Sequence, residues 1–201
     1  MEALSLGLSL ASLALSGVTF WLTSLRKGTV RMTKPTLVFF GPDGGGDAQP
    51  KVYLRSLLVS TSKRGVVVEN MYVRLRRGED SVLSSVWSYG ERNALVPGGG
   101  VFVGPEGVSS NHHFLLPREH QFIAGTYAVE IFARVLGRDS PLPLHSIEVD
   151  FSTDQFSDSS GVFFRWLPES NGYHAERRAP RLPSGTRAGT LSLLPPAASD
   201  E

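Results

Sequence analysis

The side chains best suited to chemistry in this sequence are three histidines, His112, His113 and His120. Imidazole is a common metal ligand, and it exchanges protons near neutral pH. The run around the first two is β-prone, and adjacent residues of a strand point to opposite faces of the sheet. Such a pair can chelate one ion only if the strand is bulged. We therefore predict no metal site.

Other motifs that carry chemistry are also missing. The stretch "EVDFSTDQFSD" lacks the compact D-x-D-x-D-G spacing of a calcium loop, although it offers four carboxylates: Glu148, Asp150, Asp154 and Asp158. The glycines of "PDGGGD" and "PGGG" are not followed by the Lys and helix that hold a phosphate. No G-x-S-x-G elbow occurs. We expect no catalytic residue and no cofactor, and we do not expect an enzyme.

The N-terminal segment is the most informative part of the chain. Ala3 to Leu25 carries no charge, and as a helix it would be roughly 34 Å long, enough for a hydrocarbon core of about 30 Å. Hydroxyl side chains recur in alternating steps of four and three along one helical face. That face consists of Ser5, Ser9, Ser12, Ser16, Thr19 and Thr23. Since small side chains let a second helix approach closely, we predict a transmembrane helix that packs through this hydroxyl stripe.

A cleaved signal sequence and a soluble or interfacial helix are the alternatives. The segment has only Glu2 before it where a signal would have basic residues, and no A-x-A-like site follows a short apolar core. A soluble helix would carry Lys, Glu or Arg on its polar face. Positive charges follow the segment, and the excess of Lys and Arg marks the cytoplasmic side. These are Arg26, Lys27, Arg31 and Lys34, so the body is expected in the cytoplasm.

The remainder of the chain alternates apolar and polar residues with a period of two. The clearest example is "TYAVEIFARVLG", and about eight such runs are separated by Gly, Pro, Asp and Asn. This pattern predicts an all-β, antiparallel sandwich. We expect an anchor helix over 1–28, the β-sandwich domain over 29–167 and a disordered Pro- and Arg-containing tail over 168–201.

One stretch narrows the architecture. In "QFIAGTYAVEIFARV" a Gly and then Tyr127 open the most regular strand. This resembles the corner of immunoglobulin-like and fibronectin-type sandwiches, where a Tyr hydroxyl bonds to the backbone a few residues upstream. The resemblance implies an Ig-like fold with Tyr127 as the structural corner. The chain has no cysteine, so the inter-sheet disulfide of antibody domains is excluded.

The overall charge bears on the partner. Twenty Lys and Arg against nineteen Asp and Glu give a formal net charge of +1, which does not suit a protein that grips nucleic acid. We expect a membrane-tethered, non-catalytic interaction module that docks a protein partner, or a second copy, through its helix or a sandwich face. The alternative is a small-ligand or metal-binding accessory subunit of a membrane enzyme. This ligand-binding alternative would be supported if His112, His113 and His120 converged in one pocket. An enzyme with a dispersed site is the third possibility.

Overall fold

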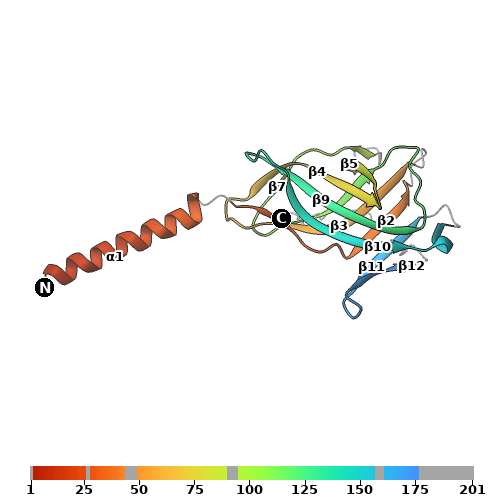
Figure 1. Ribbon diagram of the computed structural model, residues 1–201. Helices are drawn as coiled ribbons and strands as arrows, with labels where there is room; N and C mark the ends of the chain where they lie inside the picture. Colours follow the sequence, from red (N-terminus) through yellow and green to blue (C-terminus); the bar gives the residue numbers. More distant parts are fainter. Residues whose placement is uncertain (1, 26–27, 44–48, 90–94, 157–160, 177–201) are drawn as a thin grey trace, which may run out of the picture.

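The chain forms one N-terminal helix followed by a β-domain (Figure 1). The structure, a computed structural model, describes residues 2–25, 28–43, 49–89, 95–156 and 161–176. The helix α1 covers Glu2–Phe20 and continues as a π-helical segment over Trp21–Leu25. The strands are β1 (Val30–Met32), β2 (Leu37–Pro42), β3 (Pro50–Ser60), β4 (Val66–Arg77), β5 (Asp80–Tyr89), β6 (Leu95–Pro97), β7 (Val101–Val103), β8 (Val108–Leu115), β9 (Gly125–Val135), β10 (Leu142–Phe151), β11 (Val162–Leu167) and β12 (Gly172–Glu176). A short 3₁₀ helix covers Thr153–Phe156.

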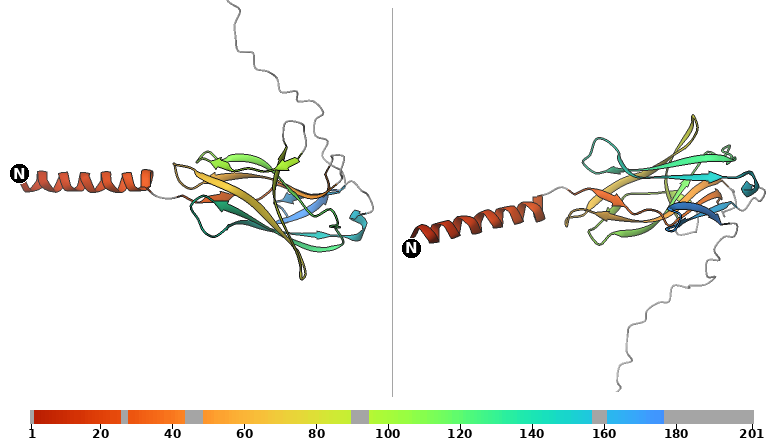
Figure 2. Two further views of the ribbon diagram at one scale, coloured as in Figure 1. Left: turned by 90° about the horizontal axis from the view of Figure 1, so that it is seen from above. Right: turned by 60° about the horizontal axis from the view of Figure 1, so that its bottom comes forward.

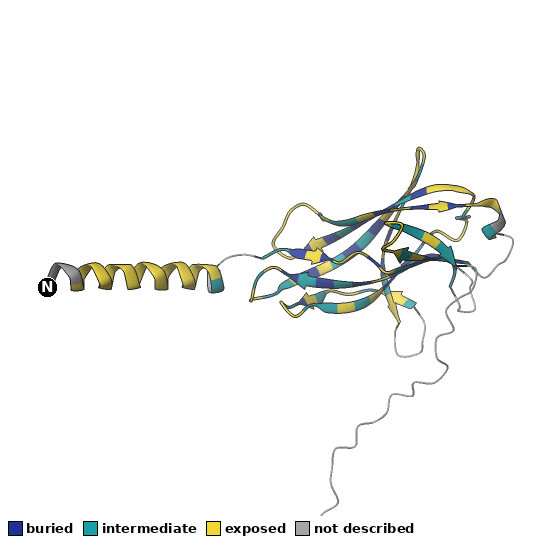
Figure 3. Ribbon diagram, turned by 90° about the horizontal axis from the view of Figure 1, so that it is seen from below, coloured by how far each residue is buried: buried dark blue, intermediate teal, exposed yellow. Residues whose placement is uncertain are grey.

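The helix forms from local preferences alone. Leucine and alanine favour a helix, and the β-branched residues of α1, Val18 and Thr19, come only in its last turn. Every backbone hydrogen bond of a helix lies within its own segment, so α1 needs no contact with the rest of the chain. It extends away from one end of the β-domain, and its surface is exposed along its length (Figures 2 and 3).

The strands form a single twelve-stranded sheet whose main path is β10-β9-β4-β5-β8-β3-β2-β11-β12. All the pairings are antiparallel, as predicted; β1 pairs with β3, β6 with β5 and β7 with β4. Strand β5 joins the two layers. Its first part, through Ser85, pairs with β4, and Val86 and Trp87 pair with β8. Strand β10 also contacts β1 and β12, which brings the two ends of the sheet together.

The fold is therefore nearer to a barrel than to a sandwich of two separate sheets. A ten-residue strand is long enough to bond one layer with its first half and the other layer with its second. The ladder consequently passes from layer to layer without a break. Sequence periodicity predicted the antiparallel strands correctly, but it does not report which strand crosses over.

The core lies between the two layers, as the buried bands in Figure 3 show. Residues on the inward faces of β4 and β9 follow the predicted alternation, and all of them are buried: Met71, Val73, Leu75, Tyr127, Val129, Ile131, Ala133 and Val135. Toward the end of the domain away from α1, the core becomes aromatic. Phe40 there contacts the rings of Phe122, Tyr127, Phe151 and Phe164, at centroid distances between 4.9 and 6.3 Å.

The predicted boundary between domain and tail is wrong. Residues 168–176 form a turn and the strand β12, which pairs with β11 along its length. Asn171 has a positive φ of 48°, a conformation that Asn tolerates in tight turns. The Tyr173 hydroxyl donates a 2.6 Å hydrogen bond to the Pro35 carbonyl, which ties the hairpin to the domain. The domain thus extends to Glu176, because a five-residue strand is too short for periodicity to reveal. The remainder of the predicted tail, 177–201, lies outside the described residues.

Candidate functional site

The exposed apolar surface of α1 is the first candidate. The span Ser5–Thr23 is long and apolar enough to cross a membrane, and none of it is buried against the rest of the protein. A signal sequence passes the same test of length and composition. The large apolar side chains of α1 and of the π-helical segment, from Leu6 to Leu22, are between 46% and 70% exposed. The helix therefore needs an apolar environment that the β-domain does not supply.

The hydroxyl stripe is bonded within the helix. Ser9 Oγ donates to the Ser5 carbonyl at 3.0 Å, Thr19 Oγ1 to the Leu15 carbonyl at 2.8 Å, and Thr23 Oγ1 to the Thr19 carbonyl at 2.8 Å. These hydroxyls already have an acceptor, so an apolar solvent does not leave their protons unpaired. Thr23 lies in the π-helical segment and departs from the α-helical spacing on which its place in the stripe was predicted.

The four basic residues predicted to set topology have different surroundings. Arg26 and Lys27 lie outside the described residues. Arg31 is exposed on β1. Lys34 contacts the β-domain: its Nζ lies 3.3 Å from the centroid of the Trp166 ring, which is a cation–π contact.

Tyr127 makes the upstream backbone contact that the resemblance implied. Its hydroxyl accepts a hydrogen bond from the Ile123 backbone N–H at 3.1 Å, and the residue is only 2% exposed. Gly125, with φ of 135°, begins β9 two residues earlier. Tyr127 thus joins the start of β9 to the segment before it, and its ring packs in the aromatic core.

The three histidines lie in three different places. His112 points inward beside a cavity of about 270 Å³, which Met71, Val86 and Gly99 also line. Burial lowers the pKa of His112 to about 4, and the neighbouring His113 adds to the effect. Its Nε2 is buried, with no hydrogen-bond partner in the part of the chain that the structure describes.

His113 faces the opposite side of β8, as predicted for adjacent strand residues. Its ring lies between those of Tyr53 and Tyr89, each 4.8 Å away by centroid. Beside it, the buried Lys51 forms a 2.5 Å ion pair with Asp43. Burial lowers the pKa of His113 to about 4; Lys51 lowers it further, and Asp43 opposes the shift. Both adjacent histidines are consequently neutral at pH 7.

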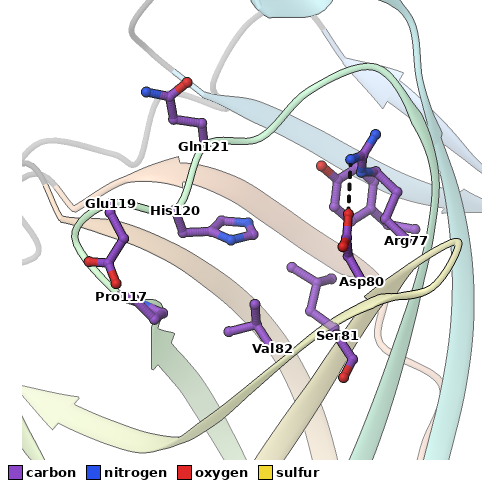
Figure 4. A pocket seen from close by; sticks show the side chains of 10 residues that line it. Arg77, Asp80, Ser81, Val82, Pro117, Glu119, His120 and Gln121 are labelled. Atoms are coloured by element: carbon purple, nitrogen blue, oxygen red, sulfur yellow. Dashed lines mark hydrogen bonds and ion pairs between the residues drawn. The ribbon is translucent and has the colours of Figure 1, made fainter.

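His120 lines a second cavity, of about 400 Å³, near the β4–β5 hairpin (Figure 4). Its ring points into the cavity, and an ion pair between Arg77 and Asp80, 3.3 Å long, lies on another wall. Burial lowers the pKa of His120, assisted by Arg77 and opposed by Glu119. Within the described ranges, no group of three or more His, Asp or Glu side chains could hold a metal ion.

The acidic stretch gathers no described cluster of carboxylates either. Glu148 and Asp150 lie on the exposed face of β10, and Asp150 Oδ1 accepts a 2.5 Å hydrogen bond from the Thr126 hydroxyl. Asp154 belongs to the 3₁₀ helix, with a side chain that is not described, and Asp158 lies outside the described residues.

A second candidate surface was missed by the sequence analysis. Three apolar side chains lie side by side on the outer face of neighbouring strands, at the end of the domain next to α1. Val67 is 38% exposed, Phe102 60% and Leu136 61%. We name these three residues the apolar row. The signal was present in "VFV" and "RVL", where an apolar residue takes the outward position beside an inward one. The sequence could not show that the three meet.

Comparison with known proteins adds little. No family model matches the chain, and no curated protein matches it. A solved structure that resembles it is that of a Bordetella pertussis protein provisionally named ApaA, with 13% identity. The match covers 62% of this chain and 94% of that one, with a TM-score of 0.35. A superposition this loose supports no conclusion about function.

Proposed function

We propose that this protein is a membrane-tethered, non-catalytic β-domain that docks a protein partner through its helix or through a face of the domain. The observation that carries the proposal is the unburied apolar surface of α1. Each large apolar side chain gains about 1.5–3 kcal/mol on leaving water. Nine such side chains of this segment are exposed: Leu6, Leu8, Leu10, Leu13, Leu15, Val18, Phe20, Trp21 and Leu22. A bilayer supplies the apolar environment for all of them at once.

Retention of the helix fits better than cleavage. The π-helical segment ends at Leu25. By Thr29 the chain is bonded to the β-domain, since the Thr29 N–H donates to Thr61 Oγ1 at 2.9 Å. The few residues between them include Arg26 and Lys27 and no A-x-A-like site. The same two charges support a single pass with the domain in the cytoplasm.

Within a bilayer, the hydroxyl stripe is the face suited to another helix. Its side chains are small, and the hydroxyl protons of Ser9, Thr19 and Thr23 are bonded to carbonyls of the same helix. Association would therefore rest on close packing, with the hydroxyl oxygens still able to accept a bond. The partner is a transmembrane helix of another protein or of a second copy.

The Ig-like assignment is part of this proposal. The bond from the Ile123 N–H to the Tyr127 hydroxyl supports it, and the continuous ladder through β5 distinguishes the domain from a sandwich of two separate sheets. The ligand- or metal-binding alternative gains no support, because His112 and His120 line separate cavities and His113 lies on the opposite face of β8.

The experiment has a tethering arm and a docking arm. Membranes containing the full chain are washed with alkaline carbonate, and the mass of the retained protein is measured. We expect the intact chain in the membrane, and release when Leu10→Arg and Leu13→Arg are combined, since each charge at a helix centre costs about 2.5–3.5 kcal/mol. Leu10→Ile with Leu13→Ile is the matched control. A mature protein that lacks residues 1–25, or an Arg variant that stays bound, would overturn the tether.

The docking arm uses a reporter of transmembrane helix association. Replacing Ser9, Ser12 and Ser16 by Leu keeps the helix apolar but enlarges the stripe, so we expect a loss of signal. Replacing Leu8, Leu13 and Leu15 by Ile leaves the stripe intact and should preserve the signal. If both sets behave like the wild type, the helix is an anchor only, and the partner must bind the β-domain.

A further inference from the structure

The apolar row is built by two strands and by the turn after a third, and these are distant in sequence. Val67 of β4 pairs directly with Phe102 of β7, and on its other side the Leu136 N–H donates to the Val67 carbonyl at 3.0 Å. The inward residues beside them, Val68, Val103 and Val135, are at most 3% exposed. The row is thus the outer surface of a part of the domain whose inward residues are buried.

The row lies at the end of the domain to which α1 is joined. Gly28 and Leu136 line the same cavity, of about 280 Å³. Figure 2 shows the helix leaving this end of the domain. Three peptide units separate Leu25 from Gly28, and a fully extended chain of that length reaches about 10 Å. When α1 spans a bilayer, this end of the domain is held at the headgroup region, which is roughly 5–7 Å deep on each side.

The charges around the row suit a phospholipid surface. Lys63 and Arg64 are exposed in the turn before β4, and Arg138 is exposed in the turn after β9. Arg64 and Arg138 line the cavity that Leu136 and Gly28 share. Of the acidic residues nearby, Glu69 is paired with Arg134, and Asp139 follows Arg138 and is exposed. Basic groups beside exposed apolar side chains form the usual composition of a surface that lies at a membrane interface.

We propose that the end of the β-domain next to α1 is itself a membrane-contacting surface. Phe102 and Leu136 enter the bilayer interface, and Arg64 and Arg138 contact lipid phosphates. This inference rests on the proposed membrane tether. Its consequence is orientation: the domain is held at two places, the helix and the apolar row. The β11–β12 hairpin, which lies away from the end of the domain that carries α1 (Figure 1), is then left open to a partner.

The test uses the absence of cysteine from the chain, because one introduced cysteine accepts a single spin label. The full chain is reconstituted in vesicles of phosphatidylcholine and phosphatidylglycerol, with Phe102→Cys or Leu136→Cys labelled. Collision with oxygen, which concentrates in lipid, is compared with collision with a water-soluble nickel chelate. Leu83→Cys is the matched control, since Leu83 is 62% exposed against 60% and 61% for the two test positions. Leu83 pairs with Arg74, seven residues along β4 from Val67, or about 23 Å away.

We expect an oxygen-to-nickel ratio several-fold higher at positions 102 and 136 than at position 83. A label at Leu13→Cys reports the tether separately. If the label at position 13 has the high ratio of a lipid environment while positions 102 and 136 have the same ratio as position 83, the tether holds and the surface proposal is overturned. If position 13 also reads as water, the proposed function itself fails. Arg64→Gln with Arg138→Gln should lower the ratio at 136, whereas Arg64→Lys with Arg138→Lys should retain it. An unchanged ratio in the Gln variant would overturn the phosphate contact.

Discussion

The helix and the β-domain use the same aliphatic residues in opposite ways. Leu13 and Leu15 of α1 are 70% exposed, whereas Leu54 and Leu58 of β3 are completely buried. The helix satisfies its backbone internally, so its side chains are free to face an external apolar medium. Strands satisfy their backbone only against other strands, and pairing brings the inward side chains together. The difference indicates that the domain is stabilised by its own core, whereas the helix rests on local backbone bonds and leaves its apolar side chains exposed.

The largest effect expected from a single substitution is at the aromatic core. Phe40→Ala removes a ring that contacts four other rings, so it should lower the free energy of unfolding by about 3–5 kcal/mol. Leu13→Ala in α1 should leave the unfolding of the domain unchanged. Both are measured by urea denaturation of the full chain in detergent micelles, with tryptophan fluorescence and a Trp21→Phe background. A comparable loss from Leu13→Ala would mean that the helix packs on the domain.

The two regions should also differ in their response to pH. Burial lowers the pKa of His112 to about 4 from 6.5, so between these values the unfolded state binds a proton that the folded state does not. The stability of the domain is therefore complete above about pH 6.5 and falls as the pH drops toward 4. The loss from His112 is on the order of 3 kcal/mol, at 1.36 kcal/mol per pKa unit.

His112→Gln should reduce this fall when denaturation midpoints at pH 7 and pH 4.5 are compared. The other titratable groups are the same in both proteins, so the difference between them reports His112 together with its interaction with His113. Membrane retention of the chain through α1 should not change over the same pH range, because no side chain between Ala3 and Leu25 titrates there. If the stability of wild type and variant depended equally on pH, His112 would bind its proton equally well in the folded and the unfolded protein, which contradicts the prediction.

The smallest of these effects concerns one hydroxyl group. Tyr127→Phe removes the acceptor of the Ile123 N–H and leaves that donor unpaired, at a cost of about 1–3 kcal/mol. Tyr72→Phe is the control, since it removes a hydroxyl from the outer face of β4 and should have little effect. Denaturant midpoints measure both. An unchanged midpoint for Tyr127→Phe would make Tyr127 an ordinary inward residue of β9.

Features with a local signature were predictable. In the run from Tyr127 to Val135, Glu130 and Arg134 take outward positions, and the five inward residues are buried as the pattern indicated. The opposed directions of His112 and His113 follow from the geometry of any strand. The crossing of β5 between layers, the short strand β12 and the position of Lys34 over the Trp166 ring have no such signature. Each depends on partners that are distant in the sequence.

The sequence by itself determined the helix, the antiparallel strands and the inward face of the most regular strand, β9. These depend on periodicity and on backbone preferences that act over a few residues. Only the tertiary structure decided which outward faces adjoin. It placed His120 on a different cavity from His112, and it brought Val67, Phe102 and Leu136 into one row beside the end of α1. The physical reason is that strand hydrogen bonds are made between distant segments, so neighbours across a sheet are fixed by topology and register.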